Sequence, residues 1–268
     1  MKTKSWSRRV ACLLLVLLGC GLLFPACNSS LPATVVPAPR EEYDWWQQRF
    51  NAINERVRQG NIDMVFIGDS ITQGWEGAGA AIWDKYYAGR NAANLGIGGD
   101  CTQQVLWRLD NGNVDGISPK VAIVLIGTNN YDRPAKEIAL GVRAVVSKLR
   151  QKLPDTRILL LAIFPRGDVE EKYQQVLKDA SACFARLDAD PMVDYMDIGQ
   201  VFLDADGMLQ RNIMPDLLHP GEAGYQLWAD AIEPRLVQML AENRRAMAPE
   251  KETLWAALRT ILLSCGFV

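Results

Sequence analysis

The central part of the chain alternates short apolar runs with longer segments of helical periodicity. Short continuous apolar runs bounded by glycine or charge are typical of buried strands, whereas apolar positions three or four apart are typical of helices. This pattern predicts strands at 63–68, 91–96, 120–127, 157–164 and 192–198, and helices at 41–60, 78–87, 101–109, 135–153, 170–187 and 221–245. It also predicts an interruption of the last helix at Pro234, because proline lacks the amide hydrogen that a helix needs.

Strands that alternate with helices in this way favour a parallel sheet covered by helices on both faces. We therefore expect an α/β fold in which five parallel strands form the middle layer of a three-layer α/β/α sandwich. Ligands in such sheets bind at the carboxyl ends of the strands, so residues that carry chemistry should directly follow strands.

Polar motifs occur at these places. "GDS" (68–70) follows the first predicted strand, "GIGGD" (96–100) the second and "GTNN" (127–130) the third. Asp216 and His219, the only histidine of the chain, precede the last predicted helix. Because the carboxyl ends of parallel strands share one edge of the sheet, we expect these motifs to form one site.

The residue types in this site predict acyl transfer. A serine hydroxyl is a weak nucleophile until a base takes its proton, and His219 is the single imidazole available. A tight turn would bring the carboxylate of Asp216 to one ring nitrogen of His219, while the other nitrogen faces Ser70. The backbone amides of Ser70 and Gly99 and the side-chain amide of Asn129 are suitable donors to an oxyanion.

Each motif alone also has a purely structural interpretation, as a turn after a strand or as a loop with a solvated histidine. Their combination, each in its own predicted loop, favours the catalytic interpretation. "GIGG" lacks the G-x-G-x-x-G spacing and the lysine of a phosphate-binding loop, which argues against nucleotide binding. "GDSIT" lacks the second glycine of a G-x-S-x-G elbow, which argues against the α/β-hydrolase fold.

The first 27 residues have the composition of an export signal: "MKTKSWSRRV" is basic and "ACLLLVLLGCGLLF" is apolar but short for a membrane span of about 20 residues. Cys20 in "LLGC" and Cys27 in "FPAC" both resemble bacterial lipoprotein boxes. We favour lipidation of Cys27, because a polar segment follows it directly. An ordinary cleaved signal and an uncleaved anchor are the alternatives, and all three predict an exported protein.

The domain boundaries follow from these patterns. We expect an export signal at 1–27, a flexible Pro/Ser/Ala tether at 28–40, the α/β domain at 41–245, and a helical C-terminal extension at 246–268. Docking of this extension on the domain is the default interpretation, with binding of a partner or contact with a membrane as alternatives.

Composition excludes several functions. A net charge of −2 without a clustered basic segment argues against nucleic-acid binding. A single histidine, and three scattered cysteines beyond the leader (Cys101, Cys183 and Cys265), do not have the spacing of a metal site, so no metal is expected and at most one disulfide could form.

Four segments together resemble a known family. "FIGDSITQGW", "NLGIGGDCTQQVLWRLDNGNV", "IGTNN" and "DLLHPGEAGY" are similar to blocks I, II, III and V of the SGNH, or GDSL-type, hydrolases. The second and third segments, with "PRG" at 165–167, resemble most closely the catalytic alpha subunits of platelet-activating-factor acetylhydrolase Ib. The resemblance covers residues 60–245 and implies a flavodoxin-like sandwich without a cofactor.

The resemblance also implies roles for individual residues. Ser70 would form an acyl-enzyme, Asp216 and His219 would be the acid–base pair, and Ser70, Gly99 and Asn129 would form the oxyanion hole. The positions that match the acyl pocket of the acetylhydrolases are Ile71, Thr128 and Leu218, where bulk favours a small acyl group such as acetyl.

The expected function is therefore that of an exported serine esterase acting on short-acyl oxygen esters of a small molecule, lipid or glycan. The animal acetylhydrolases are intracellular, so the export signal favours a carbohydrate ester or a general esterase role over a platelet-activating-factor-like lipid. A non-catalytic carbohydrate-binding protein and an acyltransferase are the alternatives. Expected partners are the membrane, through the lipid anchor, and a second copy in a homodimer.

Overall fold

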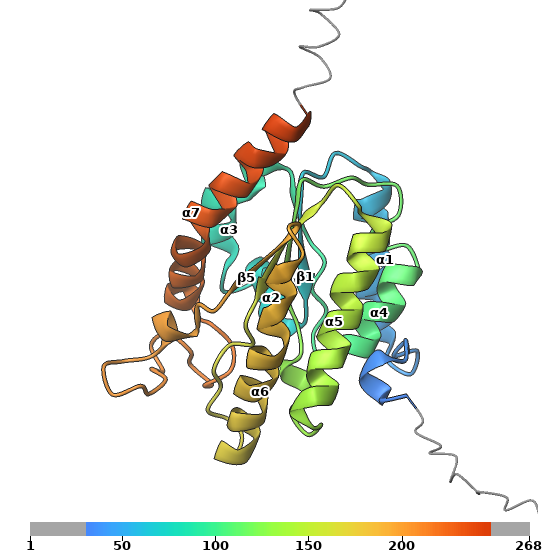
Figure 1. The fold of residues 1–268 in the computed structure, drawn as a ribbon. Helices are drawn as coiled ribbons and strands as arrows, with labels where there is room; N and C mark the ends of the chain where they lie inside the picture. The colour runs from blue at the N-terminus through green and yellow to red at the C-terminus, as the bar shows by residue number, and fades with distance from the viewer. Residues whose placement is uncertain (1–30, 248–268) are drawn as a thin grey trace, which may run out of the picture. The chain divides into compact units, whose positions relative to one another are not determined.

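A computed structural model describes residues 31–247 of the chain (Figure 1). Its strands are β1 (Met64–Gly68), β2 (Ala92–Asn94), β3 (Val121–Leu125), β4 (Arg157–Leu161) and β5 (Val193–Met196). They form one sheet in the order β2-β1-β3-β4-β5, and every neighbouring pair is parallel. The predicted five-stranded parallel sheet is confirmed.

The α-helices lie at the predicted places, with one addition. They are α1 (Asp44–Arg58), α2 (Ser70–Gln73), α3 (Ala80–Tyr86), α4 (Thr102–Asp110), α5 (Ala135–Lys152), α6 (Glu171–Phe184) and α7 (Glu222–Met247). Short 3-10 turns are found at Ala33–Val35, Gly74–Glu76, Ala88–Arg90, Thr128–Asn130, Ala185–Ala189 and Gly199–Phe202. The addition is α2, whose four residues are too few to produce a periodic pattern.

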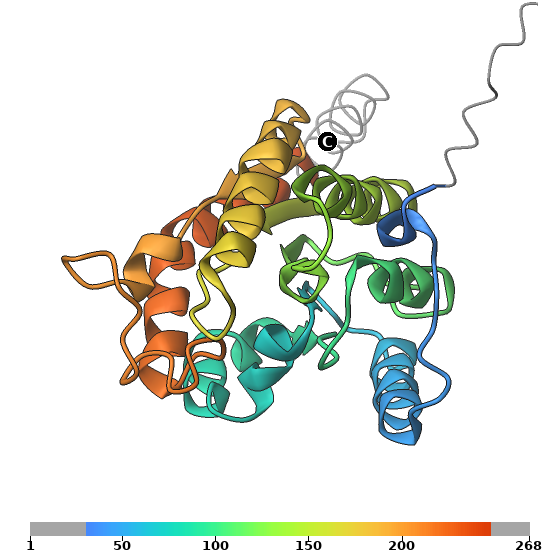
Figure 2. The same ribbon diagram turned by 90° about the horizontal axis from the view of Figure 1, so that it is seen from below.

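The helices cover both faces of the sheet (Figures 1 and 2). Successive side chains of a strand point to opposite faces, so β1 supplies two separate apolar cores. Val65 and Ile67 pack in the core shared with α1, α4, α5 and α6. Met64 and Phe66 pack in the other core, with α3 and α7. The predicted three-layer α/β/α sandwich is therefore confirmed.

The last helix differs from the prediction, because α7 continues through Pro234 without a break. Trp228 and Ile232 before the proline, and Leu236 and Met239 after it, are all fully buried. The apolar face of α7 is thus packed on the sheet both before and after the proline. The stabilisation from this packing outweighs the loss of the hydrogen bond that proline cannot make.

The predicted tether is wrong for residues 31–40, which pack on the domain. Thr34 is fully buried, and its Oγ1 donates to the carbonyl of Glu137 at 2.7 Å. Thr102 Oγ1 donates to the Thr34 carbonyl at 2.8 Å, and the amide of Ala38 donates to the Gln103 carbonyl at 3.2 Å. We call residues 31–43 the N-terminal strap. Its composition resembles that of a linker, but polar groups of Thr34 and Ala38 are hydrogen-bonded to α4 and α5.

Other predictions fall outside the described residues: the export signal with Cys20 and Cys27, the first part of the tether, and all but the first two residues of the C-terminal extension, including Cys265. Between residues 31 and 247, Cys101 and Cys183 are free thiols. No helix in that range combines the length and apolar character needed to cross a bilayer.

Candidate active site

Ser70 lies at the point where β1 turns into α2. A Cβ on Gly68, the last residue of β1, would lie 2.1 Å from Thr72 Oγ1 and 2.3 Å from the Leu125 carbonyl, so only glycine fits this turn. The next residue, Asp69, caps α2 through its Oδ1, which accepts from the amide of Ile71 at 3.0 Å. This turn leaves Ser70 at the carboxyl edge of the sheet and partly exposed.

The structure brings Ser70, His219 and Asp216 into one chain of hydrogen bonds. His219 Nε2 lies 2.9 Å from Ser70 Oγ, and His219 Nδ1 lies 2.6 Å from Asp216 Oδ2. Ser70 and His219 are 149 positions apart in sequence; Ser70 is the first residue of α2, and His219 lies in the loop before α7. The imidazole is thus placed to exchange a proton with the hydroxyl while the carboxylate holds its other nitrogen.

Asp216 also organises the turn that carries the histidine. Its Oδ1 accepts from the amides of Leu218 at 3.0 Å and His219 at 2.7 Å. Partial burial opposes ionisation, but these bonds and the one from the His219 ring together lower the pKa of Asp216 to about 2. Leu217 takes a left-handed conformation with φ of 63°, which is uncommon for a non-glycine residue and tightens the turn. Asp216 is therefore an ionised acceptor at neutral pH.

The loop of "GIGGD" lies against the serine. A Cβ on Gly98 would lie 3.8 Å from Ser70 Cβ, and the Gly98 amide donates to Gln73 Oε1 at 2.7 Å. Gly99 has a φ of +71°, which side chains rarely adopt. On the other side of the loop, Asn129 Nδ2 donates to the Asp100 carbonyl at 2.9 Å. The predicted oxyanion donors thus belong to segments in direct contact with one another.

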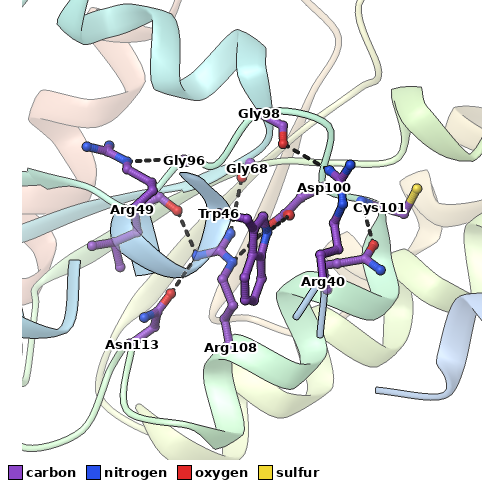
Figure 3. Close-up of polar contacts among 12 residues, drawn as sticks. Arg40, Trp46, Arg49, Gly68, Gly96, Gly98, Asp100, Cys101, Arg108 and Asn113 are labelled. Carbon is purple, nitrogen blue, oxygen red and sulfur yellow. Dashed lines mark hydrogen bonds and ion pairs between the residues drawn. The ribbon is translucent and has the colours of Figure 1, made fainter. Parts of the chain in front are cut away.

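A buried polar network beneath this loop was not predicted (Figure 3). The guanidinium of Arg108 donates to the Asp100 carboxylate at 2.8 Å, to the Leu95 carbonyl at 2.9 Å and to the Gly68 carbonyl at 3.2 Å. Trp46 Nε1 donates to the other carboxylate oxygen of Asp100 at 2.6 Å. The sequence signal was a charged residue on the apolar face of the predicted helix 101–109, beside Leu109.

The predicted acyl-pocket residues lie close to this site but differ in exposure. Ile71 is buried and Leu218 is half-buried, and both belong to the apolar core on the α7 face. Thr128 is buried, and its carbonyl and hydroxyl accept from Arg166 at 3.0 and 3.3 Å. A concavity of about 240 Å³ lies elsewhere, between α1 and the edge strand β2, and its walls contain none of the predicted site residues.

The described residues contain no group of three or more His, Cys, Asp or Glu side chains that could hold a metal ion.

Asp69, the residue before the serine, is a titratable group that is fully buried. Burial is the main cause that raises the pKa of Asp69, to about 7. Its Oδ2 has no hydrogen-bond partner among residues 31–247.

A parallel sheet with a hydrogen-bonded serine, histidine and aspartate at its carboxyl edge is an arrangement that suits ester hydrolysis. Residues 66–227 match the GDSL-like lipase/acylhydrolase family, and the chain belongs to this family. Human platelet-activating factor acetylhydrolase IB subunit alpha1 is 35% identical over 191 residues, which cover 70% of this chain and 80% of that protein. The chain is therefore an ester hydrolase acting on small-molecule or lipid esters.

Solved structures agree with the fold. A structure from Streptococcus pneumonia is 25% identical with a TM-score of 0.59 and covers 72% of this chain and 94% of its own. A catalytic mutant of an acetylxylan esterase from Geobacillus stearothermophilus is 16% identical with a TM-score of 0.53, covering 68% of this chain and 94% of its own. The second similarity supports the fold alone.

The raised pKa of Asp69 predicts a specific dependence of stability on pH. A carboxyl whose pKa rises on folding stabilises the native state fully below its unfolded pKa of 3.8, and this contribution is lost as pH rises to about 7. Asp69→Asn keeps the oxygen that caps α2 but cannot titrate. The free energy of unfolding of the variant, relative to wild type, should therefore rise by roughly 2–4 kcal/mol between pH 4 and pH 8.

Urea unfolding of both proteins at pH 4, 5.5 and 8 measures this difference. The comparison cancels the titration of the other carboxyl groups. The stability that depends on ionised Asp216 is lost mainly below its unfolded pKa of 3.8, which is outside this range. A difference between the two proteins that is constant from pH 4 to pH 8 would contradict the assignment to Asp69.

Proposed function

We propose that the chain is an exported serine esterase that hydrolyses short-acyl oxygen esters, with acetyl as the preferred group, through an acyl-enzyme on Ser70. The observation that carries this proposal is the hydrogen-bonded chain from Ser70 Oγ through His219 to Asp216. It has the nucleophile, the base and the orienting carboxylate in contact before any substrate arrives.

In the proposed acylation step, Ser70 Oγ attacks the ester carbonyl carbon as His219 Nε2 takes the hydroxyl proton. The carboxylate of Asp216 accepts a hydrogen bond from Nδ1–H, so it fixes the tautomer and stabilises the imidazolium. The tetrahedral intermediate collapses, the C–O bond to the alcohol breaks, and the imidazolium gives its proton to the departing oxygen. A water molecule, deprotonated by His219, then attacks the acyl-serine carbonyl. The C–O bond to Ser70 Oγ breaks, the imidazolium returns its proton to this oxygen, and the acid is released.

The oxyanion of both intermediates would accept from the backbone N–H of Ser70, the N–H of Gly99 and the side chain of Asn129. One N–H of the Asn129 amide is directed to the Asp100 carbonyl, and an amide carries two such hydrogens. The second hydrogen can therefore serve the oxyanion. Fixed donors of this kind contribute more to the rate than the same groups in water, because they need no reorganisation.

Hydrolysis is favoured over acyl transfer by the exposure of the base. The side chains of His219 and Asp216 are 40% and 56% exposed, so water can reach the imidazole directly. Acyl transfer would require a site that keeps water away from the acyl-serine.

Replacing Ser70 or His219 with alanine should reduce kcat/KM by similar factors, on the order of 10⁴ or more, because the two side chains act as one unit. Since the chain contains a single histidine, no second imidazole can replace it. Hydrolysis of p-nitrophenyl acetate and labelling by a fluorophosphonate probe measure both effects, and circular dichroism checks folding. Near-normal activity of folded His219→Ala would overturn the mechanism.

Acetyl preference is supported by the bulk of Ile71, the residue after Ser70, and of Leu218, the residue before His219, and by the acetylhydrolase activity for which the human relative is named. Wild type should hydrolyse p-nitrophenyl acetate faster than the octanoate. Leu218→Ala should shift this ratio towards octanoate roughly tenfold, since a pocket discriminates about 1–3 kcal/mol per methylene-sized change.

Leu227→Ala is the matched control, because Leu227 is a half-buried leucine of the same apolar core on α7. It should leave the ratio unchanged. Faster hydrolysis of octanoate by wild type, or an equal shift in both variants, would refute a pocket formed by Leu218.

Export rests on the sequence of residues 1–27, and we propose that Cys27 is lipidated and anchors the mature protein. Expression of the full chain in a bacterium should give a membrane-associated form whose mature N-terminus is diacylglyceryl-Cys27 by mass spectrometry. Cys27→Ala should remove the lipid, whereas Cys20→Ala should leave it in place. A lipid on Cys20, or an unlipidated N-terminus in wild type, would reject this processing site.

A further inference from the structure

The N-terminal strap ends beside the loop of "GIGGD" and delivers an arginine to it. Arg40 Nη1 donates to the carbonyl of Gly98 at 3.2 Å (Figure 3). A Cβ on Gly99 would lie only 2.5 Å from the same nitrogen, so the guanidinium lies directly over the Gly98–Gly99 peptide. Arg40, which the sequence pattern assigned to the flexible tether, thus contacts the proposed oxyanion hole.

The carbonyl that Arg40 binds and the N–H of Gly99 are two ends of one peptide group. In a trans peptide these groups point in opposite directions, so a donor that fixes the Gly98 carbonyl also fixes the direction of the Gly99 N–H. A hydrogen bond to the carbonyl, here from a charged donor, also polarises the peptide and makes its N–H a stronger donor.

This peptide has an alternative orientation that the fold alone does not exclude. The amide of Asp100 donates to the Ile97 carbonyl at 3.3 Å, so residues 97–100 form a β-turn with Gly98 and Gly99 at its centre. The φ of +71° at Gly99 is that of a type II turn. A type I turn differs by rotation of the central peptide through about half a turn, and glycine at both central positions permits it.

The neighbouring groups of the loop are held by other residues. The Gly98 amide is fixed by Gln73, and the Asp100 side chain is fixed by Arg108 and Trp46. None of these bonds involves the carbonyl of Gly98, whose donor is Arg40.

The guanidinium is itself held in place by two aromatic rings of the strap and α1. Arg40 Cζ lies 4.7 Å from the ring centroid of Tyr43 and 5.3 Å from that of Trp45. Contacts of this kind are attractive and restrict the long arginine side chain before the substrate binds. Their effect is to present Nη1 to the Gly98 carbonyl at low cost in side-chain entropy.

We propose that Arg40 is a positioning residue for the ester hydrolysis: it holds the Gly98–Gly99 peptide in the type II orientation and aims the Gly99 N–H at the oxyanion. The inference rests on the proposed function and specifies a group, outside the four sequence motifs, on which the oxyanion hole depends. Arg40 acts through the peptide and does not contact the substrate.

The test compares Arg40→Ala and Arg40→Lys with wild type and with Arg143→Ala, which removes an exposed arginine of α5. The readouts are kcat and KM for p-nitrophenyl acetate, the Ki of a phenylboronic acid that forms a tetrahedral adduct with serine, and the thermal midpoint. Loss of a whole oxyanion donor costs roughly 10²–10³ in kcat, so loss of its orientation should cost less.

We expect Arg40→Ala to lower kcat roughly 5- to 50-fold with KM changed less than about twofold, and to raise the boronate Ki by a similar factor. Arg40→Lys should recover part of both losses, and added guanidinium ion should partly restore Arg40→Ala. The thermal midpoints of both Arg40 variants should match that of Arg143→Ala. A general loosening of the strap would instead lower the midpoints of the Arg40 variants.

Two results would overturn the inference alone, given an active wild type. In the first, the kcat and the boronate Ki of Arg40→Ala lie within twofold of the wild-type values. In the second, Arg40→Ala changes only KM, which would mean that Arg40 binds substrate. A wild type that neither hydrolyses the ester nor reacts with a fluorophosphonate would overturn the proposed function and the inference with it.

Discussion

The burial of one guanidinium, that of Arg108, fixes the relative positions of the loops that form the site. A buried arginine must satisfy all its N–H donors, because an unpaired charge in the interior costs several kcal/mol. Its acceptors are the Asp100 carboxylate and the carbonyls of Gly68 and Leu95, together with the side chain of Asn113. Gly68 ends β1 and Leu95 follows β2, so the arginine lies where these two neighbouring strands end.

This arrangement satisfies two requirements with one set of bonds. Strand ends that approach each other leave carbonyls without a partner in the sheet, and a charged carboxylate at Asp100 needs donors of its own. An apolar side chain of similar size at position 108 would fill the space but remove the donors of the Leu95 carbonyl, the Asn113 side chain and one oxygen of Asp100. The network therefore specifies where the loops after β1 and β2 lie, which is a condition that a site built from separate loops must meet.

Much of the fold and of the site could be predicted because the signals are local. A strand such as 120–127 is a continuous apolar run, and Ser70, Asn129 and His219 each lie just after a recognisable strand or just before a recognisable helix. The errors concern tertiary interactions. The last helix continues through Pro234 because apolar residues before and after the proline are buried. The strap packs on the domain because α4 and α5 supply hydrogen-bond partners to Thr34. Neither partner is visible in the local sequence.

Arg108 and Arg40 were missed for the same reason. A charged residue in an amphipathic helix or a linker is ordinarily solvated, and only the three-dimensional arrangement shows that their acceptors include backbone carbonyls 13 to 58 positions away. The four motifs name the atoms that face the substrate. The groups that orient those atoms are distributed along the chain and have no motif of their own.

The distance between nucleophile and base depends further on a single helix. Two residues after His219 the chain turns at Gly221 and enters α7, so the start of this helix limits where the imidazole can lie. From the same helix, the Tyr225 hydroxyl donates to the carbonyl of Ile71, the residue after Ser70, at 2.7 Å. Tyr225 is buried against α2, and a Cβ on Gly74 would lie 2.0 Å from its hydroxyl. A shift of α7 on the sheet would therefore move the histidine and the segment that carries the serine together, which keeps their contact while the rest of the core relaxes.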